Sequence, residues 1–361
     1  MTCLTAARIV TGDGGVSASP AWVVVEDGRI VASGSGAAPQ PAEDLGDALL
    51  APGFVDLQVN GTGTLDFATA SIDELRAAID SLVAGGCTSL LPTLCSAPLD
   101  TYLPALQRIA DLRATCDAVL GVHLEGPFLG GAPGAHPTDL VRPVDLPWLV
   151  GLLDATGDLI RLVTLAPEAD PGFAATRALT QRGIAVALGH SIAGYDEARA
   201  GADAGARMVT HCFNGMGPLH HRAPGLPGAA LDDRRLVPSV ICDLVHVHPA
   251  VLRMVTTVRP DAVAVTDAVG GDLVVGDGGA AYLADGTLAG ARVTMAEVVQ
   301  NLAGIGLAPG AAVRMATGNG AKAIGATDRG RIAPGCRADF VTLDPDTLAV
   351  REVWVGGTRR M

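Results

Sequence analysis

The sequence predicts an α/β protein, a (β/α)₈ barrel with a small β-sandwich domain built from both termini. In the long middle of the chain, eight short apolar runs alternate with helical patterns over roughly 270 residues, the repeat number and size of such a barrel. At both ends, apolar and polar residues instead alternate with a period of two, which is typical of half-buried antiparallel strands.

The two ends of the chain are each too short to bury a core alone. The period-two pattern predicts strands at residues 7–10, 21–26, 29–32, 338–343 and 349–355. An Asp27-Gly28 pair marks the turn between two of them. We therefore expect one β-sandwich domain from residues 1–50 and 329–361, and a barrel domain from residues 51–328.

The middle segment supplies the expected barrel strands and their helices. The strands lie near residues 54–60, 87–91, 118–124, 159–165, 184–188, 207–211, 237–242 and 262–266. Helical patterns occupy most of the intervals, at residues 71–84, 99–115, 171–182, 193–204 and 249–258. Ser71 and Glu74 form a capping-box pattern at the first helix. An open doubly wound sheet is the alternative, but it normally carries a GxGxxG loop after its first strand, and residues 60–63 begin no such loop.

The composition excludes several classes of function. The net charge of −13 argues against a nucleic-acid-binding surface, and an anionic substrate would need a local basic pocket. No basic-then-apolar leader is present, and no uninterrupted apolar stretch reaches about 18 residues, so no membrane segment is expected. The seven cysteines show no CxxC pair, which predicts small buried thiols in a reducing compartment and a cytoplasmic protein.

Four of the expected barrel strands run into a residue that can bind a metal or move a proton: Glu125, His190, His211 and Asp267. Burying such a group without a partner costs several kcal/mol, and the C-terminal ends of barrel strands meet at one mouth. A carboxylate with two imidazoles is a common ligand set of catalytic zinc, and a neighbouring aspartate can move the proton of a metal-activated water. Taken singly, each residue could instead be a hydrogen-bonded core histidine or a turn carboxylate.

Further motifs resemble known proteins. Residues 52–56 (PGFVD) and 330–335 (GRIAPG), the latter followed by Ala338-Asp339, resemble the amidohydrolase superfamily. Residues 121–128 (GVHLEGPF), 210–216 (THCFNGM), 224–226 (PGL) and 242–247 (CDLVHV) are similar to the N-acetylglucosamine-6-phosphate deacetylase family within it. The resemblance implies hydrolysis of the acetamide of N-acetylglucosamine 6-phosphate, giving glucosamine 6-phosphate and acetate. The alternative is a related hydrolase that deacetylates another N-acyl hexosamine or opens a cyclic amide.

The resemblance also implies a role for each matching residue. Glu125, His190 and His211 are the expected ligands of one divalent ion, with zinc as the expected metal. Asp267 is the expected general base, which then protonates the departing amine. His136 is expected to contact the substrate near the acetamide, as a second catalytic residue.

The same comparison implies how the sugar phosphate is bound. His246 is expected to contact the sugar, and Asn214, the backbone at Gly215 and Arg222 to form the phosphate site. In the family this arginine comes from a neighbouring subunit, so the resemblance implies a homodimer in which Arg222 reaches the partner's active site. In so acidic a protein, one guanidinium and several backbone N–H donors can bind a phosphate by charge-assisted hydrogen bonds.

The chain also departs from the superfamily at the end of its first barrel strand. Gln58 and Asn60 stand where most members have His-x-His and bind a second metal. Amide side chains are poor ligands for zinc-like ions, so that second position is expected to hold no metal. A bridging carboxylated lysine is excluded because the only lysine, Lys322, lies beyond the barrel strands. We therefore expect one tightly bound metal.

Overall fold

The computed structural model describes residues 1–360. The chain forms two compact units. One comprises Met1–Asp56, Ile79–Ser89 and the chain from Thr294 onward, and the other comprises Leu57–Ala78 and Leu90–Val293. The sequence-based domain boundaries at residues 50 and 329 stay a prediction.

Eight strands form a single sheet whose spatial order follows the chain. They are β7 (Phe54–Val59), β10 (Cys87–Leu94), β11 (Val122–Glu125), β12 (Ile160–Leu165), β13 (Ala185–Leu188), β14 (Met208–Val209), β15 (Val237–Ile241) and β16 (Val263–Val265). The registers from β10 to β16 are parallel. The sheet nearly closes on itself beside its outer strands, β7 and β16. There Val59 forms a β-bridge with Ala268, and the backbone amide of Asn60 donates to the carbonyl of Ala268 over 2.7 Å. The predicted barrel is confirmed.

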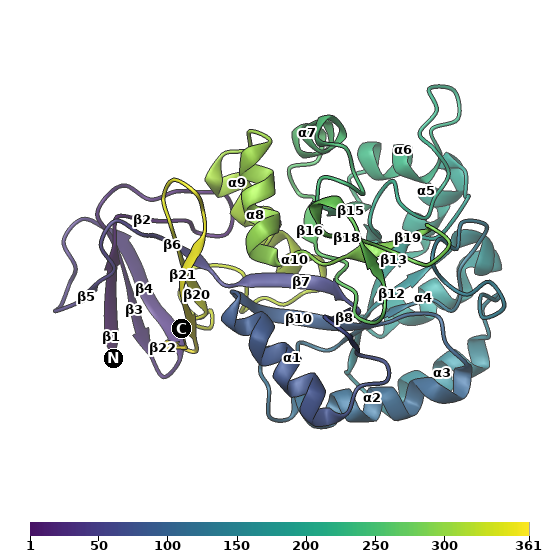
Figure 1. Ribbon diagram of the computed structural model, residues 1–361, viewed down its shortest axis with the longest axis horizontal. Helices are drawn as coiled ribbons and strands as arrows, with labels where there is room; N and C mark the ends of the chain where they lie inside the picture. The colour runs from purple at the N-terminus through teal and green to yellow at the C-terminus, as the bar shows by residue number, and fades with distance from the viewer. Residues whose placement is uncertain (361) are drawn as a thin grey trace. The chain divides into compact units, whose positions relative to one another are not determined.

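The barrel strands read as continuous apolar runs because both of their faces are covered. Every residue of β7 and of β10 is buried. Figure 1 shows α2 to α7 around the outside of the sheet. A strand covered on both faces has no solvent side on which a charged residue could lie, so charged groups are expected at its ends.

The helices between residues 72 and 258 are α1 (Ile72–Ala84), α2 (Leu99–Arg113), α3 (Leu146–Thr156), α4 (Ala174–Gln181), α5 (Tyr195–Ala204), α6 (Gly225–Asp232) and α7 (Pro249–Val258). All of them except α3 and α6 match the expected ranges to within a few residues. The capping box of α1 is confirmed, since the amide and Oγ of Ser71 both donate to Glu74 Oε2. None of the helices within residues 1–360 is long and apolar enough to cross a bilayer.

The helices α3 and α6 were not among the expected ranges. The side chain of Asp145 caps α3 by accepting from the amide of Trp148 over 3.0 Å. The sequence of α6, GLPGAALD, contains two glycines and a proline, so its helix propensity is low. Five of its eight residues are buried, and packing therefore outweighs propensity there.

Short strands follow the first and last barrel strands and were also not expected. β8 (Gly61–Thr62) and β9 (Leu65–Asp66) form a small hairpin after β7. β17 (Val274–Val275), β18 (Ala280–Tyr282) and β19 (Leu288–Ala291) form an antiparallel three-stranded sheet after β16. Residues of both segments line the cavity described below.

The other unit contains two sheets that share one core. The first has the order β4 (Arg29–Ser35), β3 (Ala21–Glu26), β1 (Thr2–Ala6), β5 (Glu43–Asp44). The second has the order β2 (Arg8–Ile9), β6 (Leu49–Pro52), β20 (Phe340–Leu343), β21 (Val350–Val355), β22 (Thr358–Arg359). The two ends of the chain meet where β6 pairs antiparallel with β20. Leu4 and Val23 of the first sheet share a buried cluster with Leu50 and Phe340 of the second.

The same unit includes three helices near the C-terminal end of the chain. They are α8 (Met295–Gly304), α9 (Pro309–Met315) and α10 (Gly318–Ala323). Thr294 and Glu297 close α8 with a capping box. The expected boundary at residue 329 would assign these helices to the barrel domain instead.

Candidate metal centre

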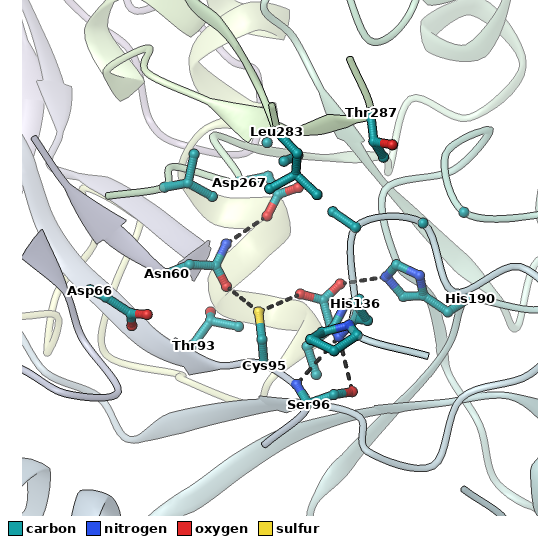
Figure 2. A pocket seen from close by; sticks show the side chains of 18 of the residues that line it. Asn60, Asp66, Thr93, Cys95, Ser96, His136, His190, Asp267, Leu283 and Thr287 are labelled. Carbon is teal, nitrogen blue, oxygen red and sulfur yellow. Dashed lines mark hydrogen bonds and ion pairs between the residues drawn. The ribbon is translucent and has the colours of Figure 1, made fainter. Parts of the chain in front are cut away.

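One cavity of about 630 Å³ gathers nearly all of the residues that the sequence singled out. The lining includes Glu125, His136, His190, His211, Asn214, Gly215, His246 and Asp267. Figure 2 shows His136, His190 and Asp267 facing this space, together with Asn60 and Cys95. Arg222 is not among the lining residues.

Three donor atoms converge on one point in this cavity. Nε2 of His190 lies 3.0 Å from Oε1 of Glu125, and Nε2 of His211 lies 2.9 Å from the same oxygen. The two Nε2 atoms are 3.0 Å apart. All three side chains are almost completely buried, at 2–5 % exposure, so water cannot compensate their charges and lone pairs.

The hydrogen bonds around these atoms indicate where the ring proton of His190 lies. Nδ1 of His190 lies 3.2 Å from the carbonyl oxygen of Ala132, which can only accept, so Nδ1 carries the ring proton. The lone pair on Nε2 of His190 then faces a carboxylate oxygen, an arrangement that repels unless a cation lies between the two. Nδ1 of His211 is buried without a hydrogen-bond partner among the described residues. One carboxylate and two imidazoles with converging lone pairs fit a divalent cation.

Burial and mutual contact shift the pKa values of Glu125 and His211 in this cluster. Burial alone would raise the pKa of Glu125, but the neighbouring His190 and His211 hold it well below its usual range. Burial alone would lower the pKa of His211, but Glu125 raises it above its ordinary value. The protein therefore stabilises a negative Glu125 only with positive charge beside it, which a bound ion also supplies.

The backbone turns in the same way at three of the site residues. His190, His211 and Asp267 each lie two residues after the end of their strand, with φ of 49°, 28° and 49°. This left-handed region is sterically costly for residues with a Cβ, at about 1–3 kcal/mol each. Next to His190, Gly215 also has positive φ, and a Cβ there would lie 2.7 Å from Nδ1 of His190. The local fold is strained where the site is built.

Gln58 and Asn60 have a role that the sequence did not indicate. Nε2 of Gln58 donates to Oε1 of Glu125 and to Oδ1 of Asp267, each over 3.0 Å. Nδ2 of Asn60 donates to the same oxygen of Asp267 over 2.8 Å. The two amides thus orient the carboxylate of Asp267, and Gln58 also links it to that of Glu125. Burial and the charge of Glu125 raise the pKa of Asp267.

His136 lies beside this cluster, with its ring centroid 4.4 Å from that of His190. Nδ1 of His136 accepts from the backbone amide of Ser96 over 3.3 Å and lies 2.9 Å from its Oγ (Figure 2). Burial and the neighbouring His190 lower the pKa of His136 to about 3, so its ring is neutral at ordinary pH. Because Nδ1 accepts, the ring proton lies on Nε2.

His246 is held by a residue that the sequence analysis did not single out. Nδ1 of His246 lies 2.6 Å from Oδ2 of Asp243, whose Oδ1 accepts from the amides of Val245 and His246. Burial would raise the pKa of Asp243, but these contacts with His246 lower it. Asp243 lies in the motif CDLVHV, so its position three residues before His246 was the available indication.

Cys95 is the second residue that sequence reasoning missed. The expectation that all cysteines are buried packing residues is wrong for Cys95, which is only half-buried and lines the cavity. Its Sγ donates to Oδ1 of Asn60 over 3.1 Å and lies 3.8 Å from Oε2 of Glu125. It follows the buried strand β10 directly, a position that matches the other site residues.

Arg222 lies outside the cavity, on an exposed turn before α6. Its Nη1 lies 2.7 Å from Nε2 of the neighbouring His221. The cavity lining, as far as residues 1–360 describe it, contains no arginine or lysine. Within one chain, the site therefore has histidines and backbone amides but no permanent cation.

Comparison with known proteins agrees with this architecture. A model of the amidohydrolase family matches residues 49–360. An N-acetylglucosamine-6-phosphate deacetylase of Bos taurus is 37 % identical over 343 residues, which cover 87 % of this chain and 84 % of that protein. An N-acetylgalactosamine-6-phosphate deacetylase of Escherichia coli O157:H7 is 36 % identical over 328 residues, covering 86 % of this chain and 87 % of that protein.

A solved structure extends the likeness to three dimensions. An aspartate-to-alanine mutant of N-acetyl-D-glucosamine-6-phosphate deacetylase from Mycobacterium smegmatis, in complex with N-acetyl-D-glucosamine 6-phosphate, is similar to this chain with a TM-score of 0.93. It is 37 % identical, and the match covers 99 % of this chain and 98 % of that one. The fold, the matched length and the converging strand ends lead to one conclusion: the chain belongs to the amidohydrolase family.

Proposed function

We propose that this protein removes the acetyl group of N-acetylglucosamine 6-phosphate, giving glucosamine 6-phosphate and acetate. The observation that carries the proposal is the donor set of Glu125, His190 and His211 beside the carboxylate of Asp267 in one cavity. Relatives with this activity in their names, matched over most of both chains, support the choice of substrate.

The resident cofactor in this proposal is one divalent ion held by Glu125, His190 and His211, and we infer zinc from the two imidazoles and one carboxylate. Such an ion, when bound, supplies Lewis-acid polarisation of the amide carbonyl and lowers the pKa of a water to about 7. The proton transfer and the hydrogen bond to the acetamide described below come from side chains of the chain itself.

Asp267 moves the proton. Asn60 and Gln58 both donate to its Oδ1, which leaves Oδ2 free of these amides to face the reacting water. Asp267 takes a proton from the attacking water and returns it to the nitrogen of the departing amine. Its raised pKa brings the carboxylate closer to the range in which it can both accept and release a proton.

His136 binds the acetamide. Its neutral ring carries the proton on Nε2, because Nδ1 accepts from Ser96. An N–H donor at this place can donate to the carbonyl oxygen and stabilise the negative charge that grows there during attack. The rigid contact with Ser96 fixes the orientation of the ring before the substrate arrives.

The sugar and its phosphate are assigned to the remaining lining residues. His246 contacts the sugar, and Asn214 and the backbone at Gly215 contribute to the phosphate site. The missing positive charge comes from Arg222 of a second copy, which makes the active form a homodimer. Two facts support this arrangement: the described cavity lining holds no arginine or lysine, and Arg222 is exposed.

We also infer a cytoplasmic location. Within residues 1–360 none of the seven cysteines forms a disulfide, and six of them are buried. A thiol-rich chain without disulfides is typical of a reducing compartment.

The test is an assay of amine release with N-acetylglucosamine 6-phosphate on chain loaded with one equivalent of zinc. We expect turnover by the native chain and a loss of at least about 100-fold in Asp267→Asn at equal metal content. Asp196→Asn, an exposed aspartate in the first turn of α5, is the matched control and should keep full activity. Near-native turnover by Asp267→Asn with its metal bound would contradict the proposal.

The galactosamine isomer is a second candidate substrate. The Escherichia coli relative named for it matches this chain as well as those named for the glucosamine compound. A panel of both 6-phosphates, their unphosphorylated forms and a cyclic amide separates these possibilities. A higher kcat/KM for the galactosamine phosphate, or for an unphosphorylated sugar or cyclic amide, would replace the substrate named above.

A further inference from the structure

Cys95 faces the side of Glu125 that the two histidine ligands do not use. Nε2 of His190 and Nε2 of His211 both contact Oε1 of Glu125, whereas Sγ of Cys95 lies 3.8 Å from Oε2. Figure 2 shows the Cys95 sulfur with Asn60 on one side and His136 on the other. Glu125 therefore offers one oxygen to each of two neighbouring groups of donors.

His136 completes the second group. One ligand atom each from Cys95, Glu125 and His136 lies within 4.8 Å of the others. Since Ser96 occupies Nδ1 of His136, the nitrogen that remains for a ligand is Nε2. Glu125 and His136 are buried and Cys95 is half-buried, so the group opens to the cavity through the thiol.

We propose that Cys95, Glu125 and His136 form a second, weaker site for a thiophilic divalent ion such as Zn²⁺ or Cd²⁺, and that an ion bound there inhibits the enzyme. A thiolate, an imidazole and a carboxylate are a zinc-type ligand set. This site differs from the second position of the superfamily, where Gln58 and Asn60 offer amides instead of imidazoles.

The distances suit a single ion. Sulfur and oxygen ligands at about 2.3 and 2.1 Å from a tetrahedral zinc lie about 3.6 Å apart, close to the 3.8 Å between Sγ of Cys95 and Oε2 of Glu125. On binding, the thiol proton leaves to solvent as the metal–sulfur bond forms, and the thiol's hydrogen bond to Asn60 is lost. The ring proton of His136 moves to Nδ1, where Oγ of Ser96 accepts it, and the hydrogen bond from the backbone amide of Ser96 to Nδ1 is lost.

Inhibition follows from the competing use of His136, and this part rests on the proposed function. An ion on Nε2 of His136 removes the N–H that binds the acetamide oxygen. It also fills the part of the cavity between His136 and Glu125 that the acetyl group must enter. The second ion should therefore compete with substrate, whereas the first is required for turnover.

The binding test uses the whole chain preloaded with one equivalent of zinc and titrated with Cd²⁺ or Co²⁺. We expect a second equivalent that dialysis removes, accompanied by a thiolate-to-metal charge-transfer band. In Cys95→Ser, the band and the second equivalent should disappear while the first equivalent stays, which shows that the variant is folded. Cys116→Ser, which changes a buried cysteine outside the cavity, is the matched control and should keep both.

Two outcomes of the titration would overturn the site: no second equivalent in the native chain, or a band that persists in Cys95→Ser. Inhibition is measured separately, as the apparent KM at increasing free zinc. KM should rise with zinc in the native chain and in Cys116→Ser but not in Cys95→Ser. Equal inhibition of all three would overturn the inhibitory role alone. A chain inactive on every acetylated sugar would refute the proposed function and leave the metal titration valid.

Discussion

The side-chain amide of Asn60 donates a hydrogen bond to Oδ1 of Asp267 across 2.8 Å. Asn60 thereby joins the end of the first barrel strand to the end of the last, where the backbones also pair between Val59 and Ala268. The residue proposed to move the proton is thus oriented by a side-chain amide at the end of the first barrel strand.

On the acid limb of the pH profile, Asn60→Asp should slow turnover by about tenfold, because a second carboxylate raises the pKa of Asp267 and lowers its ionised fraction. The change turns a donor into a second negative charge, which favours the protonated form of Asp267. Since Asp267 must be ionised to accept a proton, the acid limb of the kcat profile should move to higher pH. Gln107→Glu makes the same change on the exposed face of α2 and should leave the profile unmoved.

Removing the metal should destabilise the fold. Without an ion, Nε2 of His190 and Nε2 of His211 lie about 3 Å from Oε1 of Glu125 inside a buried site, and the lone pair of His190 faces that oxygen. An ion present at 100 times its dissociation constant stabilises the native state by about 2.7 kcal/mol. Thermal unfolding of chelated and reloaded protein should show this difference, and Glu125→Gln should respond far less. Equal melting of the two native samples would argue against the donor set.

Glu168 ties together two loops that carry site residues. Its Oε1 accepts from the amides of Gly131 and Ile192 over 3.1 and 2.9 Å, and its Oε2 accepts from Oγ of Ser191 over 2.5 Å. Glu168→Gln replaces one of these acceptor oxygens by a donor, so we expect a loss of about 1–3 kcal/mol in urea unfolding. Faster proteolysis near Gly131 should accompany it.

The control for this change is Glu197→Gln on the exposed surface of α5. That variant should match the native chain in both measurements. If Glu168→Gln also matches it, then these hydrogen bonds do not hold the loops.

Asp243 should make the free energy of unfolding depend on pH in the acid range. Its pKa is lowered in the folded state by His246, so the contribution of its carboxylate is complete above the ordinary pKa of about 3.9. As the pH falls through the lowered value, that contribution is lost. In urea unfolding at stepped pH, Asp243→Asn should show a shallower acid decline than the native chain. It should also raise KM, because Nδ1 of His246 loses its acceptor.

Asp196→Asn serves again as the control for acid stability, because Asp196 is exposed on α5. Its acid decline should be that of the native chain. A native-like decline in Asp243→Asn would show that the contact with His246 adds nothing to stability.

The barrel and the converging site residues could be predicted because both depend on periodic patterns. Each barrel strand is an apolar run, and Glu125, His190, His211 and Asp267 interrupt that pattern near the ends of four of them. Their coming together in one cavity follows from parallel strand topology alone. The sequence was equally sufficient for the capping box at Ser71 and Glu74.

The rest depends on side-chain geometry that no periodic pattern carries. Gln58 and Asn60 were seen only as missing ligands, because a donor role becomes visible only when Asp267 is placed beside them. The sequence predicts a buried packing residue at Cys95, because the cysteines show no CxxC pair, and the cavity beside it appears only in the fold. Helix α6 was not predicted because tertiary packing stabilises it despite its low helix propensity.

His190 and His211 allow the strain of the site to be measured directly. Both have left-handed backbones, which glycine adopts at little cost and alanine does not. In metal-free protein, His190→Gly and His211→Gly should be about 1 kcal/mol more stable than the corresponding alanine variants. Ala198, on the buried face of α5, supplies the control, because Ala198→Gly should be less stable than the native chain. A preference for alanine at both histidines would contradict the left-handed geometry.

The left-handed turns after β13, β14 and β16 have a practical consequence for engineering. In the absence of metal, a screen that rewards thermal resistance alone will tend to replace His190, His211 and Asp267, since relaxing each turn releases strain that the fold otherwise carries. Such a screen would enrich robust but inactive barrels. Libraries built on this scaffold should therefore keep these three codons constant and place their diversity on the outer helices.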